Sequence, residues 1–242
     1  MREAPIYFVV IVTLLGCATD ENVTSQSEAV CDVNPMLYPK NARPFDRSLE
    51  RWSELLWSWI YAQPLDQNPI LDPTGDDCGI GQQGPMWFLA AVPGSTLGTN
   101  VSRTCTIPRH KGILVQLAST VNDYPCPDPA FHPAPGQSLF DFLIAPITPL
   151  FDDESGFAIS FDGIDLVDPL SYRYTSDDLF LFKGDLSMQA FDPCVTGHQQ
   201  PAVSDGFYLP FKPMSPGAHT IVINGHDMEG VPVTLTWHLT IR

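Results

Sequence analysis

The segments HTIVIN (219–224) and VPVTLTWHLTI (231–241) decide the fold class of this chain. Apolar and polar residues alternate along both segments, which is the pattern of β-strands with one buried face. If the two strands pair as a hairpin, the alternation places His219 and Trp237 on the inner face and turns His238 outward. The end of the chain is therefore predicted to form two neighbouring strands of a β-sheet.

Further apolar runs upstream have the length of strands. They are MWFLAAV (86–92), GILVQLAS (112–119), FAISFDGIDLV (157–167), DLFLFKG (178–184) and GFYLPF (206–211). Asp162-Gly163 in the third run is a hairpin turn signal. The 24 prolines favour short segments, and strands do not alternate with helices as they do in a doubly wound sheet. We expect a mainly β protein with a β-sandwich fold, for which a jelly roll is one arrangement.

One amphipathic helix is predicted from Phe45 to Gln63, where apolar side chains recur at helical spacing. Asp46 or Ser48 can cap its start, and Pro64 ends it. The helix is expected to pack on the sandwich, because an apolar helical stripe normally faces a core. A second interpretation makes Trp57 and Trp59 an aromatic binding surface for a sugar or a lipid.

The first residues, MREAPIYFVVIVTLLGCATDEN (1–22), have the organisation of an export signal. The apolar run from Pro5 to Gly16 is too short to span a bilayer as a permanent helix. With Gly16 before Cys17, the segment resembles a bacterial lipoprotein signal, which implies acylation of Cys17 and cleavage before it. Glu3 departs from that pattern, and a plain secretory signal is the alternative. Both interpretations export the protein.

Three regions follow from these patterns: a lipoprotein signal peptide (1–16), a flexible tether (17–44) and a single β-sandwich domain (45–242). The tether is polar and lacks periodicity. Ala18 follows the cysteine at the position where aspartate would favour retention in the inner membrane. The expected location is therefore the outer membrane, with the lipid anchor as the membrane contact.

An exported protein meets an oxidising compartment in which disulfides persist. Four cysteines lie in the predicted domain, and Cys31 lies in the tether. The pairs that we favour are Cys78–Cys105 and Cys126–Cys194, although the spacing alone leaves other connectivities open. No CxxC pair is present, which argues against a zinc ribbon.

Charge excludes nucleotide and nucleic-acid partners. The formal net charge is −16, and such a surface repels nucleic acid and anionic lipid head groups. GIGQQG (79–84) has the spacing of a dinucleotide-binding fingerprint, but an acidic turn with Asp76 and Asp77 precedes it and a strand-like run follows. We interpret it as a glycine loop pinned by Cys78 that leads into a buried strand.

Calcium is the only cofactor hypothesis that the acidic turns raise. Asp72, Asp76 and Asp77 cluster in DPTGDD, and Asp152, Asp153 and Glu154 cluster in FDDESG. Carboxylate oxygens on a turn suit Ca²⁺, whereas a solvated acidic loop is the simpler interpretation. The six histidines match no metal motif such as HExxH.

Several motifs together resemble a group of uncharacterised bacterial exported proteins and lipoproteins. They are Trp52 and Trp59, Asn68-Pro69, Asp72, Thr74-Gly75, Cys78, Gly81-Gln82, Gly84, Trp87-Phe88-Leu89, Arg103, Cys105, Pro108, Asp162-Gly163, Tyr172-Arg173, Asp205-Gly206-Phe207, Pro216-Gly217 and His219. The resemblance covers most of the predicted domain. It implies an exported single domain and supplies no activity.

The expected function is that of an outer-membrane lipoprotein whose sandwich has a binding or structural role, with a glycan or a protein as its ligand. One alternative is an exported polysaccharide-acting hydrolase that uses loop carboxylates. Another is a metalloenzyme in which several histidines meet. No GxSxG elbow is present, no catalytic residue is assigned, and an enzyme is the less favoured class.

Overall fold

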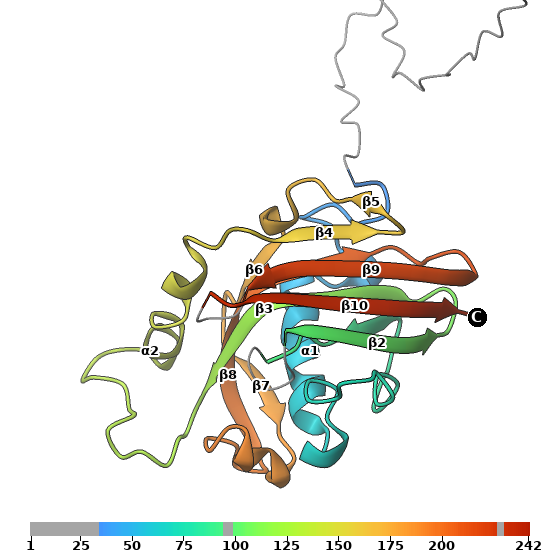
Figure 1. The fold of residues 1–242 in the computed structure, drawn as a ribbon. Helices are drawn as coiled ribbons and strands as arrows, with labels where there is room; N and C mark the ends of the chain where they lie inside the picture. The colour runs from blue at the N-terminus through green and yellow to red at the C-terminus, as the bar shows by residue number, and fades with distance from the viewer. Residues whose placement is uncertain (1–33, 94–98, 227–229) are drawn as a thin grey trace, which may run out of the picture. The chain divides into compact units, whose positions relative to one another are not determined.

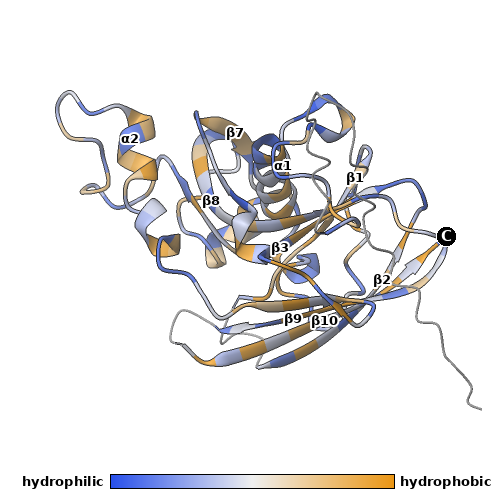
Figure 2. Ribbon diagram, turned by 90° about the horizontal axis from the view of Figure 1, so that it is seen from above, coloured by the Kyte–Doolittle hydropathy of each residue, from blue (hydrophilic) through white to orange (hydrophobic). Residues whose placement is uncertain are grey.

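Alternating apolar residues place two five-stranded sheets face to face in the computed structural model, which describes residues 34–93, 99–226 and 230–242. Figure 2 shows these sheets as two layers, and helix α1 (Leu49–Ala62) lies on the outer side of one of them. The mainly β class and the sandwich arrangement are as the sequence predicts. Residues 1–33, with the signal peptide, Cys17, Cys31 and most of the predicted tether, lie outside the described residues.

Sheet A has the order β1-β3-β8-β6, and β7 also pairs with β8. Its strands are β1 (Met86–Leu89), β3 (Gly112–Asp123), β6 (Arg173–Thr175), β7 (Phe180–Lys183) and β8 (Gln199–Phe211). Sheet B has the order β2-β10-β9-β4-β5. Its strands are β2 (Asn100–Ile107), β4 (Ala158–Phe161), β5 (Ile164–Asp165), β9 (Gly217–His226) and β10 (Pro232–Ile241).

The predicted hairpin at the end of the chain is confirmed, since β9 pairs antiparallel with β10 and Trp237 lies opposite Ile221. Trp237 is buried and His238 is exposed, as the alternation requires. The turn at Asp162 and Gly163 joins β4 to β5, and both residues have positive φ. Two pairs, β1–β3 and β2–β10, are parallel, which departs from the antiparallel arrangement of a jelly roll.

The main core lies between the sheets and under α1. Phe161 of sheet B contacts Phe211 of sheet A across the sandwich, with ring centroids 5.3 Å apart. On the opposite side of sheet A, Trp57 of α1 donates to the Tyr208 hydroxyl at 2.9 Å, and Tyr61 packs on Phe182. Figure 1 shows α1 behind the strands of sheet B.

Helix α1 is shorter at its start than predicted. Ser48 is its N-cap and accepts from the Arg51 amide, so the first of the two proposed caps, Asp46, lies in the preceding 3-10 turn (Pro44–Asp46). The sequence did not predict the short helix α2 (Leu139–Ile144) or the 3-10 turns Leu65–Gln67, Thr148–Phe151, Pro169–Ser171 and Leu186–Ala190. None of the helices in the described part of the chain is long and apolar enough to cross a bilayer.

The folded unit begins at Asn34, eleven residues before the predicted start of the domain at residue 45. Residues 34–44 were assigned to the tether, but Leu37 is fully buried and forms a β-bridge with Phe211. Asn34 exchanges two hydrogen bonds with the backbone of Val167. The folded unit therefore begins by Asn34, because these contacts order a segment whose sequence lacks any periodic pattern.

Both favoured disulfides are present, Cys78–Cys105 and Cys126–Cys194. The glycine loop also behaves as expected, because it leads directly into β1. Gly81 has a φ of +60°, and a Cβ there would lie 2.5 Å from the amide end of the Gln63 side chain, so both the backbone and the space favour glycine. The segment from 79 to 84 precedes a strand, which is not the geometry of a dinucleotide site.

Candidate functional site

The outer face of sheet B is a ladder of short uncharged side chains. Strands β2 and β10 are parallel and β10 and β9 antiparallel, so their outward residues lie directly opposite one another. Four rows result: Thr106, Thr240 and Ala218; Thr104, His238 and Thr220; Ser102, Thr236 and Val222; Asn100, Thr234 and Asn224. We call these twelve residues the hydroxyl face. β4 extends two of its rows with Ser160 and Ala158.

Hydroxyl groups dominate this surface and are regularly spaced. Neighbouring rows lie about 7 Å apart along the strands, and neighbouring strands lie about 4.8 Å apart. Each hydroxyl can both donate and accept a hydrogen bond. The hydroxyl face contains no Asp, Glu, Lys or Arg, although the chain has a formal net charge of −16. It can therefore recognise uncharged hydroxyl groups without the cost of desolvating an ion.

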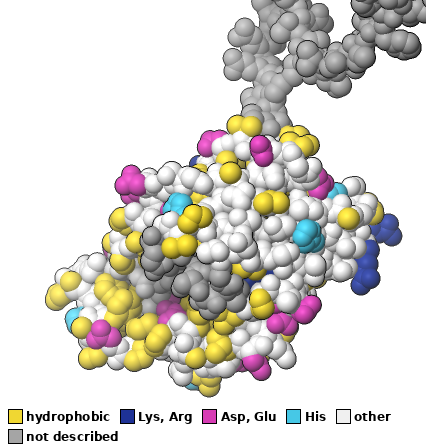
Figure 3. All heavy atoms as spheres, viewed as in Figure 1, with side chains coloured by type: hydrophobic (Ala, Val, Ile, Leu, Met, Phe, Trp, Pro, Cys, Tyr) yellow, Lys and Arg dark blue, Asp and Glu magenta, His cyan; other side chains and the backbone are white. Residues whose placement is uncertain are grey.

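Among the described residues, the acidic side chains of this sheet lie at its margins. Asp165 pairs with Ser160 at the far edge. The Asp162 carboxylate accepts from the Thr220 amide at 2.8 Å and is bound by His219 at 2.7 Å. Figure 3, viewed from the side of β9, β10 and β2, shows much white surface with scattered charged side chains toward the outline.

A shallow depression of about 450 Å³ lies where the loop from 75 to 79 meets the hydroxyl face. It is lined by Asp76, Gly79, Thr104, Thr106, His238 and Thr240 among others. The loop is held against β2, because the Thr104 amide donates to the Thr74 carbonyl at 2.8 Å. Gly75 has a φ of +89°, and a Cβ there would lie 2.3 Å from the Thr104 carbonyl oxygen. With the Cys78–Cys105 bridge, these contacts make the loop a fixed wall.

The predicted calcium ligands do not converge in this loop. Asp72 is buried, and its two carboxylate oxygens accept from the amides of Thr74 and Asp77 and from the Thr74 hydroxyl. These bonds lower the Asp72 pKa against the effect of burial. Asp72, Asp76 and Asp77 do not come within ligand distance of one another as a group. Asp72 organises the turn, and the calcium hypothesis gains no support from it.

Trp57 and Trp59 do not form an aromatic binding surface, so that interpretation is wrong. Both are buried, with 5% and 6% of their surfaces exposed. Trp59 donates from its indole to the Ile80 carbonyl at 2.7 Å and packs on Phe88. The stripe faces the sheet because α1 has one apolar side and sheet A offers the nearest apolar surface.

The histidines do not assemble a metal site in the described parts of the chain. His219 binds Asp162, His226 donates from Nε2 to the Ser155 carbonyl, and His238 lies on the hydroxyl face. His110 and His132 are exposed in loops. No group of three potential ligands that includes a histidine occurs among the residues described. The metalloenzyme alternative therefore has no geometric support.

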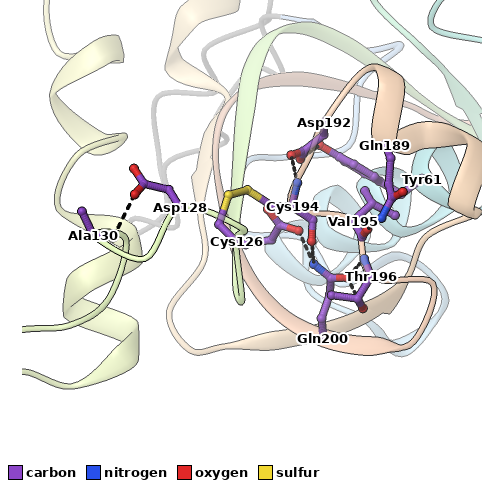
Figure 4. The surroundings of a disulfide bond; sticks show 11 residues. Tyr61, Cys126, Asp128, Ala130, Gln189, Asp192, Cys194, Val195, Thr196 and Gln200 are labelled. Atoms are coloured by element: carbon purple, nitrogen blue, oxygen red, sulfur yellow. Dashed lines mark hydrogen bonds between the residues drawn. A yellow bond between two sulfur atoms is a disulfide. The ribbon is translucent and has the colours of Figure 1, made fainter.

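A second cluster lies beside the Cys126–Cys194 disulfide (Figure 4). Ligand atoms of Asp123, Asp192 and Cys194 lie within 4.8 Å of one another. The Cys194 sulfur is bonded to Cys126, so the cluster offers two carboxylates and no thiolate. Asp192 accepts from the Tyr61 hydroxyl at 2.8 Å and from the Cys194 amide at 2.9 Å.

The two carboxylates of this cluster have different surroundings. Burial, reinforced by the nearby charge of Asp192, raises the pKa of Asp123 to about 7. The Gln200 side-chain amide covers Asp123 with a hydrogen bond. Two carboxyl groups in different surroundings can serve acid–base chemistry. Asp123, however, is only 3% exposed and does not line the depression beside the hydroxyl face. We interpret Asp123 and Asp192 as residues that stabilise the fold and have no catalytic role.

Sequence reasoning missed both features. The outward residues of β10, Thr234, Thr236, His238 and Thr240, form a visible T-x-T-x-H-x-T pattern. Its neighbour β2 was not predicted as a strand, so the ladder could not be assembled. Asp123 and Asp192 are 69 positions apart in the sequence, and no local pattern links them.

The comparisons with known proteins add little to this geometry. No protein-family model matches the chain, and no curated protein matches it. The solution structure of amebosin is similar over 59% of this chain and 96% of that chain, with 10% sequence identity and a TM-score of 0.18. Similarity at this level carries no argument about fold or function.

Proposed function

We propose that this chain is an exported binding protein that holds a neutral polysaccharide on the hydroxyl face of sheet B. The observation that carries the proposal is the absence of charge across twelve aligned surface positions in a protein with a net charge of −16. A polysaccharide without acid groups offers the matching chemistry, because its hydroxyls also donate and accept. The acidic surface elsewhere repels anionic polymers.

The shape of the sheet favours a flexible chain over a crystalline surface. Neighbouring strands in a sheet are rotated by roughly 20° relative to each other, so the rows of hydroxyls are not coplanar over the whole face. A single polysaccharide chain can follow that twist, whereas a flat crystal cannot. Each hydroxyl contributes little on its own, and a polymer gains affinity by contacting several rows together.

Export and anchoring belong to the same proposal. The segment ending in Gly16-Cys17 resembles a lipoprotein signal, and disulfides such as Cys78–Cys105 and Cys126–Cys194 persist in oxidising compartments. We therefore place the protein at the outer membrane, held through a lipid on Cys17. A Cys17→Ser variant should move from the membrane fraction to the soluble fraction after cell lysis. Equal solubility of both forms would contradict the anchor.

The binding proposal is tested by affinity electrophoresis through gels that contain dextran, mannan or, as the acidic comparison, polygalacturonate. We expect stronger retardation in at least one neutral gel than in the acidic gel. Thr236→Lys places a charge at the centre of the hydroxyl face and should weaken retention roughly tenfold, the effect of about 1.4 kcal/mol. Leu181→Lys, at an exposed position of β7 in sheet A, is the matched control.

Two results would refute this function. One is a lack of retention by every neutral polysaccharide, with the protein shown to be folded by circular dichroism. The other is equal retention of the wild type and Thr236→Lys. Thr236→Ser, which keeps the hydroxyl, should bind like the wild type and separates the loss of the group from the change of residue.

The hydrolase alternative has weaker support. It requires a carboxylic acid that touches the glycosidic oxygen. The candidate with the raised pKa, Asp123, is buried beneath Gln200 and beside the disulfide. Polysaccharide that is bound on the hydroxyl face therefore has no access to it, and we expect bound polymer to remain uncleaved.

A further inference from the structure

Positive charge is concentrated at one end of the domain. At this end β2 passes into β3 through residues 108–111, β8 ends at Phe211, and β10 ends at Ile241. The segment from 35 to 47 lies against the same end, because Leu37 bridges to Phe211 and the Phe45 ring lies next to Gly112. We call this region the basic end.

Lys and Arg outnumber acidic residues there. Segments 35–47, 108–112, 211–217 and 241–242 contain eight charged side chains, of which only Asp46 is acidic. The basic ones are Lys40, Arg43, Arg47, Arg109, Lys111, Lys212 and Arg242. In Figure 3 the largest group of dark-blue side chains lies at the right-hand margin, on the side where β10 ends in Figure 1. The chain has only 12 Lys and Arg in total, so more than half are gathered here.

Most of these cations are not neutralised by the protein. Lys40, Arg43, Arg47, Arg109 and Arg242 are exposed, and none of them forms an ion pair with a carboxylate of the described residues. Of the seven cations, Lys111 and Arg47 contact uncharged groups. Lys111 donates to the Gly84 carbonyl, and Arg47 lies 5.1 Å from the centre of the Trp52 ring. The positive charge is therefore available to a partner.

The N-terminal segment enters the domain at this end. Lys212 donates to the Pro35 carbonyl at 2.9 Å, and its amide donates to the Met36 carbonyl at 2.9 Å. Cys17, where we propose a lipid, precedes Asn34 by 17 residues, a length that spans at most about 60 Å when fully extended. A domain held by this segment has its basic end within reach of the anchoring membrane.

We propose that the basic end docks on the anionic phosphate head groups of the membrane that holds the chain. Charge complementarity and the entry point of the N-terminal segment select this partner over a free polyanion. The net charge of −16 does not prevent contact, because exposed charges more than about 8 Å from the lipid surface are screened at physiological salt. Phe45, 37% exposed between Arg43 and Arg47, adds an apolar side chain that suits the interface.

The test uses the full chain with Cys17→Ser, so that no acyl group contributes. Sedimentation is measured with vesicles of equal parts phosphatidylglycerol and phosphatidylcholine, and with vesicles of phosphatidylcholine alone. We expect tighter binding to the anionic vesicles, lost at high salt. The apolar run from Pro5 to Gly16 can add to the binding of both kinds of vesicle, so it does not affect the comparison between them. Each basic residue near an anionic surface is worth about fivefold in affinity.

Arg109→Gln should therefore weaken binding to anionic vesicles about fivefold, and the combined Lys40→Gln, Arg109→Gln and Arg242→Gln variant about a hundredfold. Within the described residues, these three side chains form no hydrogen bond or ion pair, and only their backbones are bonded, so the substitutions should leave the fold intact. Lys183→Gln, an exposed change on β7, is the matched control and should have no effect.

Three outcomes would overturn the proposal: equal binding to both vesicles, equal losses in Arg109→Gln and Lys183→Gln, or binding to soluble dextran sulfate without binding to anionic vesicles. The last outcome would show that the basic end binds a soluble polyanion and not the membrane. Retention of the triple variant in neutral polysaccharide gels tests the hydroxyl face separately, so the failure of one proposal leaves the other distinguishable.

Discussion

Arg103 and Trp237 stack across neighbouring strands in the core of the sandwich, with the guanidinium carbon 5.3 Å from the indole centre. Arg103 is fully buried and forms no ion pair with a described carboxylate. It donates instead to the carbonyls of Ala90, Ala91 and Ile70 at 2.8 to 3.2 Å. Burial lowers its pKa to about 10, which leaves the side chain charged at neutral pH.

Replacing Arg103 should therefore damage the fold. Arg103→Ala removes the donor to three buried carbonyls and leaves a cavity, for an expected loss of about 3–5 kcal/mol in the free energy of unfolding. Arg103→Met fills most of the volume and should cost less. Urea unfolding followed by tryptophan fluorescence measures both. Equal stability of Arg103→Ala and the wild type would contradict a role for this side chain in joining the sheets.

The ion pairs of Arg173 allow a matched comparison of buried and exposed carboxylates. Arg173 bonds through two nitrogens to Asp205, which is 0% exposed, and through a third to Asp152, which is 57% exposed. Arg173→Ala should cost about 3–5 kcal/mol, because it strands a buried charge. Asp152→Ala should cost less than about 1 kcal/mol. Similar losses in the two variants would show that Asp205 is not buried as a charge.

Asp123 should make stability fall as pH rises. Its pKa of about 7 in the folded protein lies above the value near 3.9 of an unfolded aspartate. The folded state thus holds the proton more tightly, so this contribution is complete below about pH 4 and is lost as pH rises through about 7. The loss is at most roughly 4 kcal/mol.

Asp123→Asn tests this dependence, because the amide can still accept from Gln200. We expect the variant to flatten the dependence of unfolding free energy on pH between about 4 and 7. Thermal unfolding across that range is the measurement. A slope that persists in Asp123→Asn would assign it to another group.

Loss of either disulfide should destabilise the protein by different amounts. The Cys78–Cys105 bridge closes 27 residues and the Cys126–Cys194 bridge closes 68. Chain entropy predicts losses of about 3.5 and about 4.4 kcal/mol for the paired Cys→Ala variants. Calorimetry under oxidising conditions measures both. Losing Cys78–Cys105 should also weaken polysaccharide retention, since that bridge holds the loop beside the hydroxyl face.

Several features of the fold were predictable because they depend on near neighbours in the sequence. The inner faces of β9 and β10 followed from alternation, and the helix pattern limited the N-cap to Asp46 or Ser48, of which the structure uses Ser48. Strand β2 was not recognised, because its inward positions include Arg103 and Cys105, which break the apolar alternation in the sequence. Trp57 was a candidate binding residue because an aromatic stripe on a helix has the same sequence pattern whether it packs on a sheet or binds a ligand.

By itself the sequence determined which side of each recognised strand is buried and where the helix runs, whereas it left the pairing of the four cysteines open. Only the tertiary structure decided that β2 lies parallel to β10, which sets Thr104 beside His238, and that segment 35–47 lies next to the turn at Arg109. The physical reason is that backbone hydrogen bonds are alike for every pair of strands. Which strand becomes a neighbour depends on how all apolar faces pack together, and no single segment contains that information.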